Sequence, residues 1–366
     1  MKSKQLRKLL DAILVPVLAI LSGLVVMGIL IVILKKPLFE SYAILFSKGF
    51  GCEEFGNCIF ITALERATPL ILTGLSAVVA FRSGMFSIGQ EGQYLLGAAI
   101  AAYLGYAIHL PPILHPLVLM LAAMLVGAGY GWIPGILKVK LGVNELLATI
   151  MLNSIAALII EYLVQFPMRG DRSTTAHSPV IDESAQLMSF LPGSKWGVGF
   201  VIAVLAVIVV YIYLWRTKAG YEQRMAGQSK RFALFGGIRS DSAAIRAMII
   251  SGALAGLAGA IEVMGVHRRI MTGFSVGLGF DGLTSAILGQ THPIGVFIVA
   301  ILFSGLKLGA QLGLQLKLGI PRELGGTIIG FIILFVAAGR LYQDNISRVR
   351  DWLDRRSIRS VKGESR

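Results

Sequence analysis

The sequence predicts an all-α fold: a polytopic helical membrane protein with about ten transmembrane spans, one of which is a broken helix. Three observations support this fold class. The 366 residues are 55% hydrophobic and only 15% charged. The apolar residues gather in blocks near the roughly 20 residues that a helix needs to cross a bilayer. Lysine and arginine concentrate in the segments that these blocks place on one side of the membrane.

Nine apolar blocks have the length of a membrane-spanning helix, or nearly so. They are predicted near residues 12–34, 62–81, 88–108, 113–137, 145–165, 197–215, 244–265, 293–313 and 324–340. Nine crossings would put the two basic ends of the chain on opposite sides. A tenth crossing over 271–291, broken at Gly277, Gly279 and Gly282, brings both ends to the same side. Irregular backbone at membrane depth is tolerated where it lies against protein or a watery cavity.

The basic residues decide the orientation of these spans. Five segments taken as cytosolic hold 22 of the 34 Lys and Arg residues, whereas three outer loops hold six, which follows the positive-inside rule. The cytosolic segments are 1–11, 81–87, 138–145, 216–246 and 340–366, and the outer loops are 35–60, 109–116 and 167–195. The chain is therefore predicted in the inner membrane, in contact with lipid, with both termini and the basic tail 341–366 in the cytosol.

The cytosolic segments also account for the net charge of +14, so no separate basic patch points to nucleic acid as a partner. No loop exceeds about 31 residues, which is too short to bury a core of its own. Residues 1–366 are therefore predicted to form a single transmembrane domain. The polar outer loop 167–195 could contact a partner, cap a pore or simply lie in solvent.

The two cysteines both fall in the outer loop 35–60. Cys52 and Cys58 are separated by five residues, and an oxidising periplasm would permit a disulfide between them. Two cysteines alone leave the bonded pair and the free thiols equally open.

The sequence lacks the motifs of an enzyme with its own nucleotide or metal. It contains no G-x-x-x-x-G-K-[ST] loop, no H-E-x-x-H pair and no Cys/His cluster, and these are the patterns that bind phosphates and zinc. We therefore expect no catalytic residue, no metal and no cofactor on this chain. Any use of ATP and its Mg²⁺ must come from a partner.

The cytosolic segment 216–246 is the most informative part of the chain. It holds seven Lys and Arg residues against two acids, so it is too polar to span a bilayer. An apolar face is nonetheless predicted on a short amphipathic helix, formed by Tyr221, Met225, Ala226, Phe232 and Phe235. A basic helix with an apolar face suits docking to a cytosolic partner.

Polar residues within the spans are costly in lipid and usually face the bundle interior or a cavity. Gln90 and Glu91 open the third block, as pore lining or hinge, or as an ordinary helix start at which the dipole favours an acid. Asn153 lies roughly 13 Å along its helix at 1.5 Å per residue, as a pore contact or an interhelical hydrogen bond. Asp281 either marks a half-helix that binds solute or serves as an N-cap.

A translocation pathway is predicted from these residues and their neighbours. Its members are Phe86, Gln90, Glu91, Asn144, Glu145, Asn153, Phe280, Asp281 and Thr284. Uncharged polar groups beside aromatic rings suit a neutral sugar or nucleoside better than an ion.

Four runs of residues resemble the permease subunits of bacterial ABC importers of the ribose-permease type. The runs are GLSAVVAFRSGMFSIGQEGQYLLGA (74–98), NELLATIMLNSIA (144–156), GFDGLTSAILGQTHPIG (279–295) and GIPRELGGTIIGFIILFVAA (319–338). The likeness covers about residues 60–340 and is strongest to the nucleoside branch, whose importers use a receptor of the basic membrane lipoprotein type.

The resemblance implies partners and a role for the cytosolic segment. It implies a cytosolic ABC ATPase that uses ATP and Mg²⁺, a second and distinct permease subunit, and a periplasmic substrate-binding lipoprotein. The residues that match the family's ATPase-coupling helix, near 217–238, are Gly220, Arg224, Gly227, Gly237 and Ile238. The chain departs from the usual pattern at Ser229, Phe232 and the pair Gln290-Thr291.

The expected function is therefore import of a nucleoside or similar neutral solute from a periplasmic receptor to the cytosol. A ribose-like sugar or riboflavin is the alternative cargo. An ion-coupled secondary transporter is a rival class, disfavoured because no span centre carries a clear charged relay.

Overall fold

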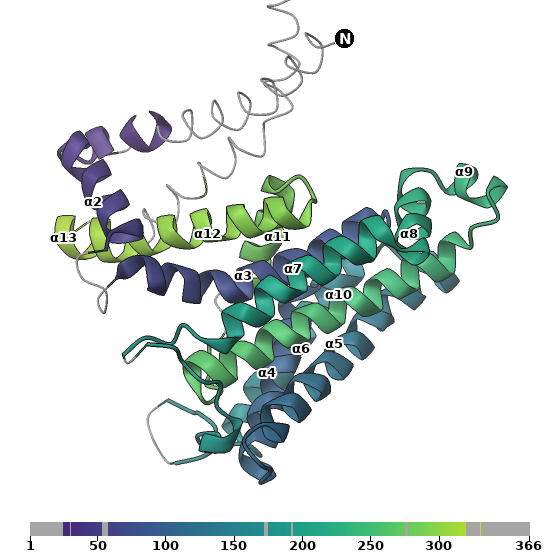
Figure 1. Ribbon diagram of the computed structural model, residues 1–366, viewed down its shortest axis with the longest axis horizontal. Helices are drawn as coiled ribbons and strands as arrows, with labels where there is room; N and C mark the ends of the chain where they lie inside the picture. The colour runs from purple at the N-terminus through teal and green to yellow at the C-terminus, as the bar shows by residue number, and fades with distance from the viewer. Residues whose placement is uncertain are drawn as a thin grey trace, which may run out of the picture. The chain divides into compact units, whose positions relative to one another are not determined.

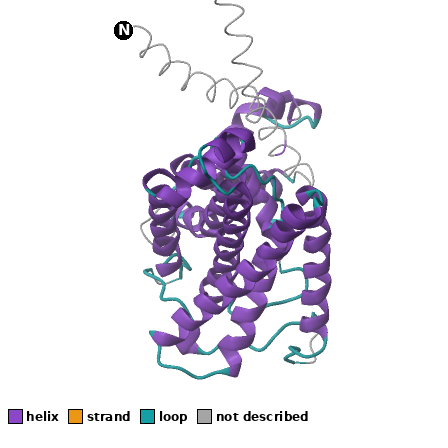
Figure 2. Cartoon of the chain, turned by 90° about the vertical axis from the view of Figure 1, so that its right-hand side faces the viewer, coloured by secondary structure: helices purple, strands orange, loops and turns teal. Residues whose placement is uncertain are grey.

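The computed structural model describes residues 25–29, 31–52, 58–171, 175–191, 193–274, 277–319 and 330. By its internal contacts the chain divides into two compact units, residues 1–49 with 306–366 and residues 50–305. The described residues form helices and connecting loops without a β-strand (Figure 2). The single domain over 1–366 stays a prediction.

The helices follow one another in the order that the apolar blocks predict. The α-helices are α2 (Leu38–Phe50), α3 (Ile59–Arg82), α4 (Gln90–Ala107), α5 (Leu114–Leu141), α6 (Glu145–Gln165), α7 (Val198–Arg216), α8 (Lys218–Gln228), α9 (Lys230–Phe235), α10 (Ser240–Glu262), α11 (Leu278–Leu288), α12 (Pro293–Gly309) and α13 (Leu316–Leu318). A 3₁₀ turn, η1 (Glu183–Ala185), and two π-helical turns, η2 (Val263–His267) and η3 (Ala310–Gln315), complete the set.

Helix α10 forms the core of the larger unit, packed against α3, α4 and α5 (Figure 1). Of its most apolar 18-residue stretch, 72% is buried, against 22% for α7. Glycines permit the close packing: a Cβ on Gly252 would lie 2.1 Å from the carbonyl oxygen of Gly127 on α5. Small residues let helix backbones approach in this way within membranes, so the glycine-rich blocks form the centre of the bundle.

Six helical segments of the described residues are long and apolar enough to cross a membrane. They are α3, α5, α6, α7, α10 extended by η2, and α12 extended through α13. Helix α4, with 18 residues, lies at the third predicted block and is not among the six. Most of the predicted span 12–34 and nearly all of 324–340 lie outside the described residues. The all-helical membrane fold is confirmed, and the count of about ten spans stays a prediction.

The segment predicted as a broken crossing is helical over only half of its length. Residues 271–274 are non-helical, and α11 begins at Leu278 after Gly277, whose φ is +84°. Residues of the loop 167–195 form backbone hydrogen bonds with the chain before α11: Ser178 N donates to the Ile270 carbonyl at 2.8 Å, and Thr272 N donates to the Ala176 carbonyl at 3.1 Å. The described part of the loop 167–195 is thus packed against the non-helical residues before α11, because irregular backbone in a helical bundle needs hydrogen-bond partners.

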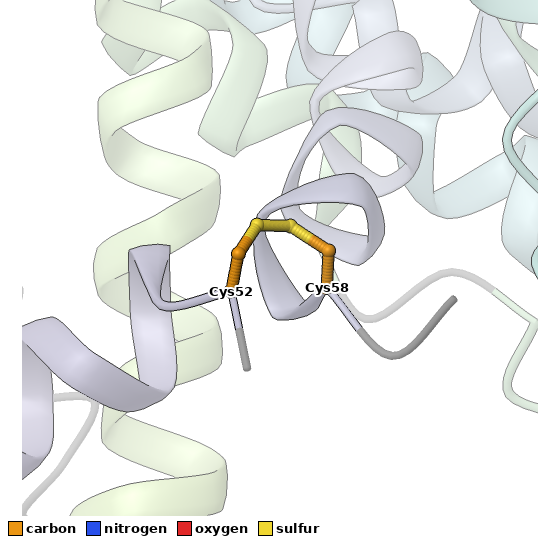
Figure 3. The surroundings of a disulfide bond; sticks show 2 residues. All are labelled: Cys52 and Cys58. Atoms are coloured by element: carbon orange, nitrogen blue, oxygen red, sulfur yellow. A yellow bond between two sulfur atoms is a disulfide. The ribbon is translucent and has the colours of Figure 1, made fainter. Parts of the chain in front are cut away.

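The two cysteines, Cys52 and Cys58, are joined by a disulfide that bridges the chain just before α3 (Figure 3).

In the smaller unit, α2 packs against the chain near η3. Ile44 and Leu45 lie against two glycines there: a Cβ on Gly309 would lie 2.1 Å from the Leu45 carbonyl oxygen, and one on Gly313 would lie 2.7 Å from the Ile44 side chain.

Candidate functional site

Helix α8 is fastened to the bundle by a glycine at each end. Thr217 caps its start by accepting a hydrogen bond from Gly220 N at 3.1 Å. A Cβ on Gly220 would lie 2.1 Å from the Tyr213 carbonyl oxygen, and one on Gly227 would lie 2.5 Å from the Arg82 carbonyl oxygen. Both glycines therefore permit backbone contact, the first with α7 and the second with the end of α3.

Between these glycines a buried glutamine, which the sequence analysis did not select, completes the attachment. Gln223 is fully buried. Its Nε2 donates to the Val79 carbonyl on α3 at 2.6 Å, and its Oε1 accepts from the Tyr213 hydroxyl at 2.8 Å. The spacing of Gly220, Gln223 and Gly227 is i, i+3, i+7, which lies on one helix face. That periodicity was the signal that could have identified Gln223.

Two arginines lie over one tryptophan beside this attachment. The Cζ atom of Arg82 is 5.3 Å from the ring centre of Trp215, and the Cζ atom of Arg224 is 5.5 Å from it. The ring of His292 lies 4.9 Å from the same tryptophan. Arg224 thus stacks on Trp215, where cation–π attraction favours a guanidinium.

The predicted single amphipathic helix over 217–238 is wrong, because the segment forms two helices. Ser229 ends α8 and caps α9, accepting a hydrogen bond from Phe232 N at 3.3 Å. The departure at Ser229 is therefore the position at which the chain turns, since a serine hydroxyl at an N-cap satisfies a free N–H group. The predicted apolar face is divided between the two helices.

The apolar residues of this segment point in two directions. Ala226 and Ala233 are buried with Ala243 of α10, and Ile238 packs against them. Phe232 and Phe235 are 66% and 94% exposed. Leu234 is as exposed as Phe232, so α9 presents an uncovered apolar surface, which we call the α9 patch: Phe232, Leu234 and Phe235. Gly237, with φ of +72°, returns the chain toward α10.

The start of α11 is capped by a residue from another helix. Glu91, in the first turn of α4, accepts a hydrogen bond from Gly279 N at 2.6 Å through Oε2. A carboxylate is favoured at a helix N-terminus because free N–H groups and the helix dipole are positive there. The alternative that Asp281 is the N-cap is wrong: Gly277 holds that position, and Asp281 lies in the first turn.

Asn153 also joins two segments, as the interhelical alternative predicted. Its Oδ1 accepts from Gly92 N at 2.9 Å, and its Nδ2 donates to the Ile88 carbonyl at 2.8 Å. Thr149, one turn earlier on α6, accepts from Ile88 N at 3.2 Å. Helix α6 therefore satisfies backbone groups of Ile88, just before α4, and of Gly92, in the first turn of α4.

The remaining predicted pathway residues do not converge on one point. Asn144 caps α6, accepting from Leu146 N, and Glu145 pairs with Lys138 at 2.6 Å. Gln90 is fully buried, and its side-chain amide has no partner within the described structure. Phe86, before α4, and Phe280, on α11, are exposed. Thr284, also on α11, is partly buried, and its hydroxyl donates to the Phe280 carbonyl.

Burial lowers the pKa of His292, and the positive charge of Arg82 lowers it further. His292 lies between α11 and α12. The neutral form of the His292 ring is therefore favoured beside Trp215.

Within the described ranges, no group of three or more His, Cys, Asp or Glu side chains is placed to hold a metal ion.

These features are typical of a helical membrane transport subunit: a glycine-packed bundle, a non-helical stretch before the short helix α11, and a basic helix pair attached to the bundle. Half-helices of this kind are typical of transporters. The chain belongs to the family described as the permease component of the branched-chain amino acid transport system, which matches residues 59–337.

Three curated proteins show how the similarity extends along the chain. The guanosine ABC transporter permease protein of Bacillus subtilis is 34% identical, over 90% of this chain and 94% of its own length. The nucleoside ABC transporter permease protein NupB of Lactococcus lactis is 32% identical, over 89% and 90%. The glucose ABC transporter permease protein of Haloferax volcanii is 29% identical, over 90% and 88%. No solved structure shows a significant match.

Proposed function

We propose that this chain is the membrane-spanning permease of an ATP-driven importer that carries a nucleoside or a similar neutral solute to the cytosol. The observation that supports this cargo is the similarity, over most of both chains, to permeases named for guanosine and for nucleosides. Proteins named for glucose and riboflavin are similar at 29% and 27% identity. A sugar or riboflavin is therefore the alternative cargo.

The partners of this importer follow from the family and from the cytosolic surface. A cytosolic ATPase, with its own ATP and Mg²⁺, would bind the α9 patch, because an amphipathic helix binds a groove through exposed apolar side chains. Lys230 and Arg231 on the same helix add positive charge. Among the predicted coupling residues, Gly220, Arg224 and Gly227 would hold α8 to the bundle, and Gly237 with Ile238 would lead from the patch to α10.

A second permease subunit and an outer receptor complete the proposed assembly. Lactococcus lactis has two nucleoside permease proteins similar to this chain, at 32% and 25% identity, which supports pairing of two distinct permeases. A periplasmic substrate-binding lipoprotein would deliver solute on the side of the disulfide and the loop 167–195. Both chain ends would then lie in the cytosol, beneath the inner membrane.

We assign the translocation pathway to the nine residues predicted for it, with different roles. Phe86 and Phe280 are 47% and 44% exposed and would contact the solute as aromatic surfaces. Glu91, Asn144, Glu145 and Asn153 make the contacts that fix the helix starts. Gln90, Asp281 and Thr284 would lie along the route between these helices.

Reconstitution tests the cargo directly. The chain, its second permease, its ATPase and its receptor would be placed in proteoliposomes and offered labelled guanosine, other nucleosides, ribose, glucose and riboflavin. We expect uptake of a nucleoside that requires ATP and that stops when the ATPase partner carries a hydrolysis-deficient substitution. Uptake of a sugar or riboflavin alone would replace the nucleoside proposal. Uptake that needs an ion gradient and no ATP would support a secondary transporter.

A further inference from the structure

The turn that follows α11 has an unusual backbone, and one side chain holds it. Gln290 and Thr291 have φ of +53° and +52°, a left-handed conformation that is rare for β-branched residues such as threonine. Arg82, the last residue of α3, donates from Nε to the Thr291 carbonyl at 2.9 Å and from a terminal nitrogen to the Gln290 carbonyl at 3.4 Å. Strained turns persist only where surrounding contacts over-determine them.

Arg82 is also the residue on which α8 rests. Its carbonyl oxygen is the atom that a Cβ on Gly227 would meet. Its guanidinium and that of Arg224 on α8 lie over the same Trp215 ring. One residue therefore contacts the cytosolic helix through its backbone and the turn after α11 through its side chain.

The other end of α11 reaches the start of α4. Helix α11 has 11 residues, about 16 Å at 1.5 Å per residue, and its Gly279 N donates to Glu91. Gly282 packs directly on Thr73 of α3, where a Cβ would lie 1.9 Å from the threonine hydroxyl. A short helix so closely packed moves as a rigid element, so a shift of the turn at 290–291 also shifts the contact with Glu91.

We propose that Arg82 is a positioning residue that makes the broken crossing follow the movement of α8. This inference rests on the proposed function, because it needs an ATPase that moves the cytosolic helices. Two adjacent contacts support this role: Gly227 packs on the Arg82 backbone, and the Arg82 guanidinium donates hydrogen bonds to the turn at 290–291. A spatial chain of contacts becomes a coupling pathway only when coupling is measured.

Substitution of Arg82 in the complete importer measures the coupling. In Arg82→Gln we expect solute transported per ATP hydrolysed to fall about tenfold, within the range of couplings between sites, while the subunits still co-purify. Arg82→Lys keeps the charge but lacks the planar fork that reaches two carbonyls, so it should lose coupling as well. Arg216→Gln removes a charge from an exposed side chain next to Trp215 and should leave the ratio unchanged.

A triple variant separates the link to α8 from simple relief of strain in the turn. Glycine adopts left-handed backbone without strain, so Gln290→Gly with Thr291→Gly should keep the shape of the turn without Arg82. The contact from the Arg82 guanidinium to the turn is still missing in that variant, so we expect its ratio of solute transported to ATP hydrolysed to stay as low as in Arg82→Gln. A wild-type ratio in Arg82→Gln would overturn the proposal, as would a wild-type ratio in the triple variant, which would show that Arg82 only relieves strain.

The solute panel distinguishes this failure from failure of the proposed cargo. If the wild-type complex imports a sugar in place of a nucleoside, the cargo is wrong, and the ratio is measured with that sugar. If nucleoside uptake is normal and Arg82→Gln leaves the ratio unchanged, the cargo holds and the positioning role is wrong.

Discussion

Helices α8 and α9 are neighbours in the basic segment between α7 and α10, yet their side chains differ in burial. In α8 the face of Gly220, Gln223 and Gly227 packs closely against α3 and α7. In α9 the only buried residue is Ala233, and three large apolar side chains are uncovered. The first helix is attached to the helical bundle, and the second leaves an apolar surface exposed, to which we propose that the ATPase binds.

Residues that match the family motif and residues that depart from it differ in burial within this segment. Positions that match the family's coupling helix, such as Gly220 and Gly227, lie inside the contact with the bundle and not on the free surface. Phe232, which departs from the family pattern, lies on the α9 patch. The two matching glycines thus lie at the attachment, while one departure, Phe232, lies on the exposed surface.

The largest effect is expected from filling the glycine contact of α8. Gly227→Trp should abolish transport, because even a Cβ there would lie 2.5 Å from a backbone oxygen and 2.8 Å from Gly84 N. Backbone atoms cannot move aside as a flexible side chain can. The measurement is nucleoside uptake together with thermal unfolding of the purified chain.

Alanine at two glycines provides the matched pair for this experiment. Gly227→Ala should lower the unfolding temperature, whereas Gly129→Ala on α5, where a Cβ meets nothing within 4 Å, should leave it unchanged or raise it. Equal stability of the two alanine variants would refute the close contact of α8 with α3.

The next effect concerns the α9 patch and should leave the fold intact. Phe235→Asp replaces a 94% exposed ring and should weaken ATPase binding about tenfold or more, as expected for an interface hot spot. Co-purification and binding of the isolated ATPase measure the loss, and thermal unfolding serves as the control. If Phe235→Asp and wild type bind the ATPase equally, the patch is not the docking surface.

A smaller effect is expected at the glutamine of α8. Gln223→Leu leaves the Val79 carbonyl and the Tyr213 hydroxyl without their partner, a loss of roughly 1–3 kcal/mol in unfolding free energy for buried polar groups. Gln228→Ala, at the exposed end of the same helix, should change it little. Chemical denaturation of both variants provides the comparison, and an unchanged Gln223→Leu would show that α8 is held by its glycines alone.

The smallest effect is expected in the pH dependence of stability, through the titration of His292, whose ring lies beside Trp215. The folded state lowers the pKa of His292 from 6.5, through burial and then the charge of Arg82. The unfolded chain therefore binds this proton more readily, so the stability from neutral His292 is present above about pH 6.5 and is lost as the pH falls below it. Thermal unfolding from pH 8 to pH 5 should show a steeper decline in wild type than in His292→Gln. Parallel curves would exclude His292 as the titrating group.

The predicted helices agree with the structure where local sequence decides them. The block 145–165 matches α6 at both ends, because an apolar run of that length, preceded by the cap Asn144, defines a helix by itself. The glycines in 271–291 likewise indicated the break before α11. The candidate site was less predictable: Asn153 was found by its depth, but Gln223 was missed because its partners, Val79 and Tyr213, are distant in sequence or on another helix.

The helical membrane class, the order of the helices and the basic segment between α7 and α10 could be predicted from the sequence alone, since length, hydropathy and charge act locally. Three features required the folded structure: the division of the basic segment into two helices at Ser229, the capping by Glu91 of a helix 188 residues further along, and the contacts by which Arg82 joins α8 to the turn after α11. The physical reason is that a buried hydrogen-bonding group must find a partner, and in a bundle that partner lies wherever packing brings another helix.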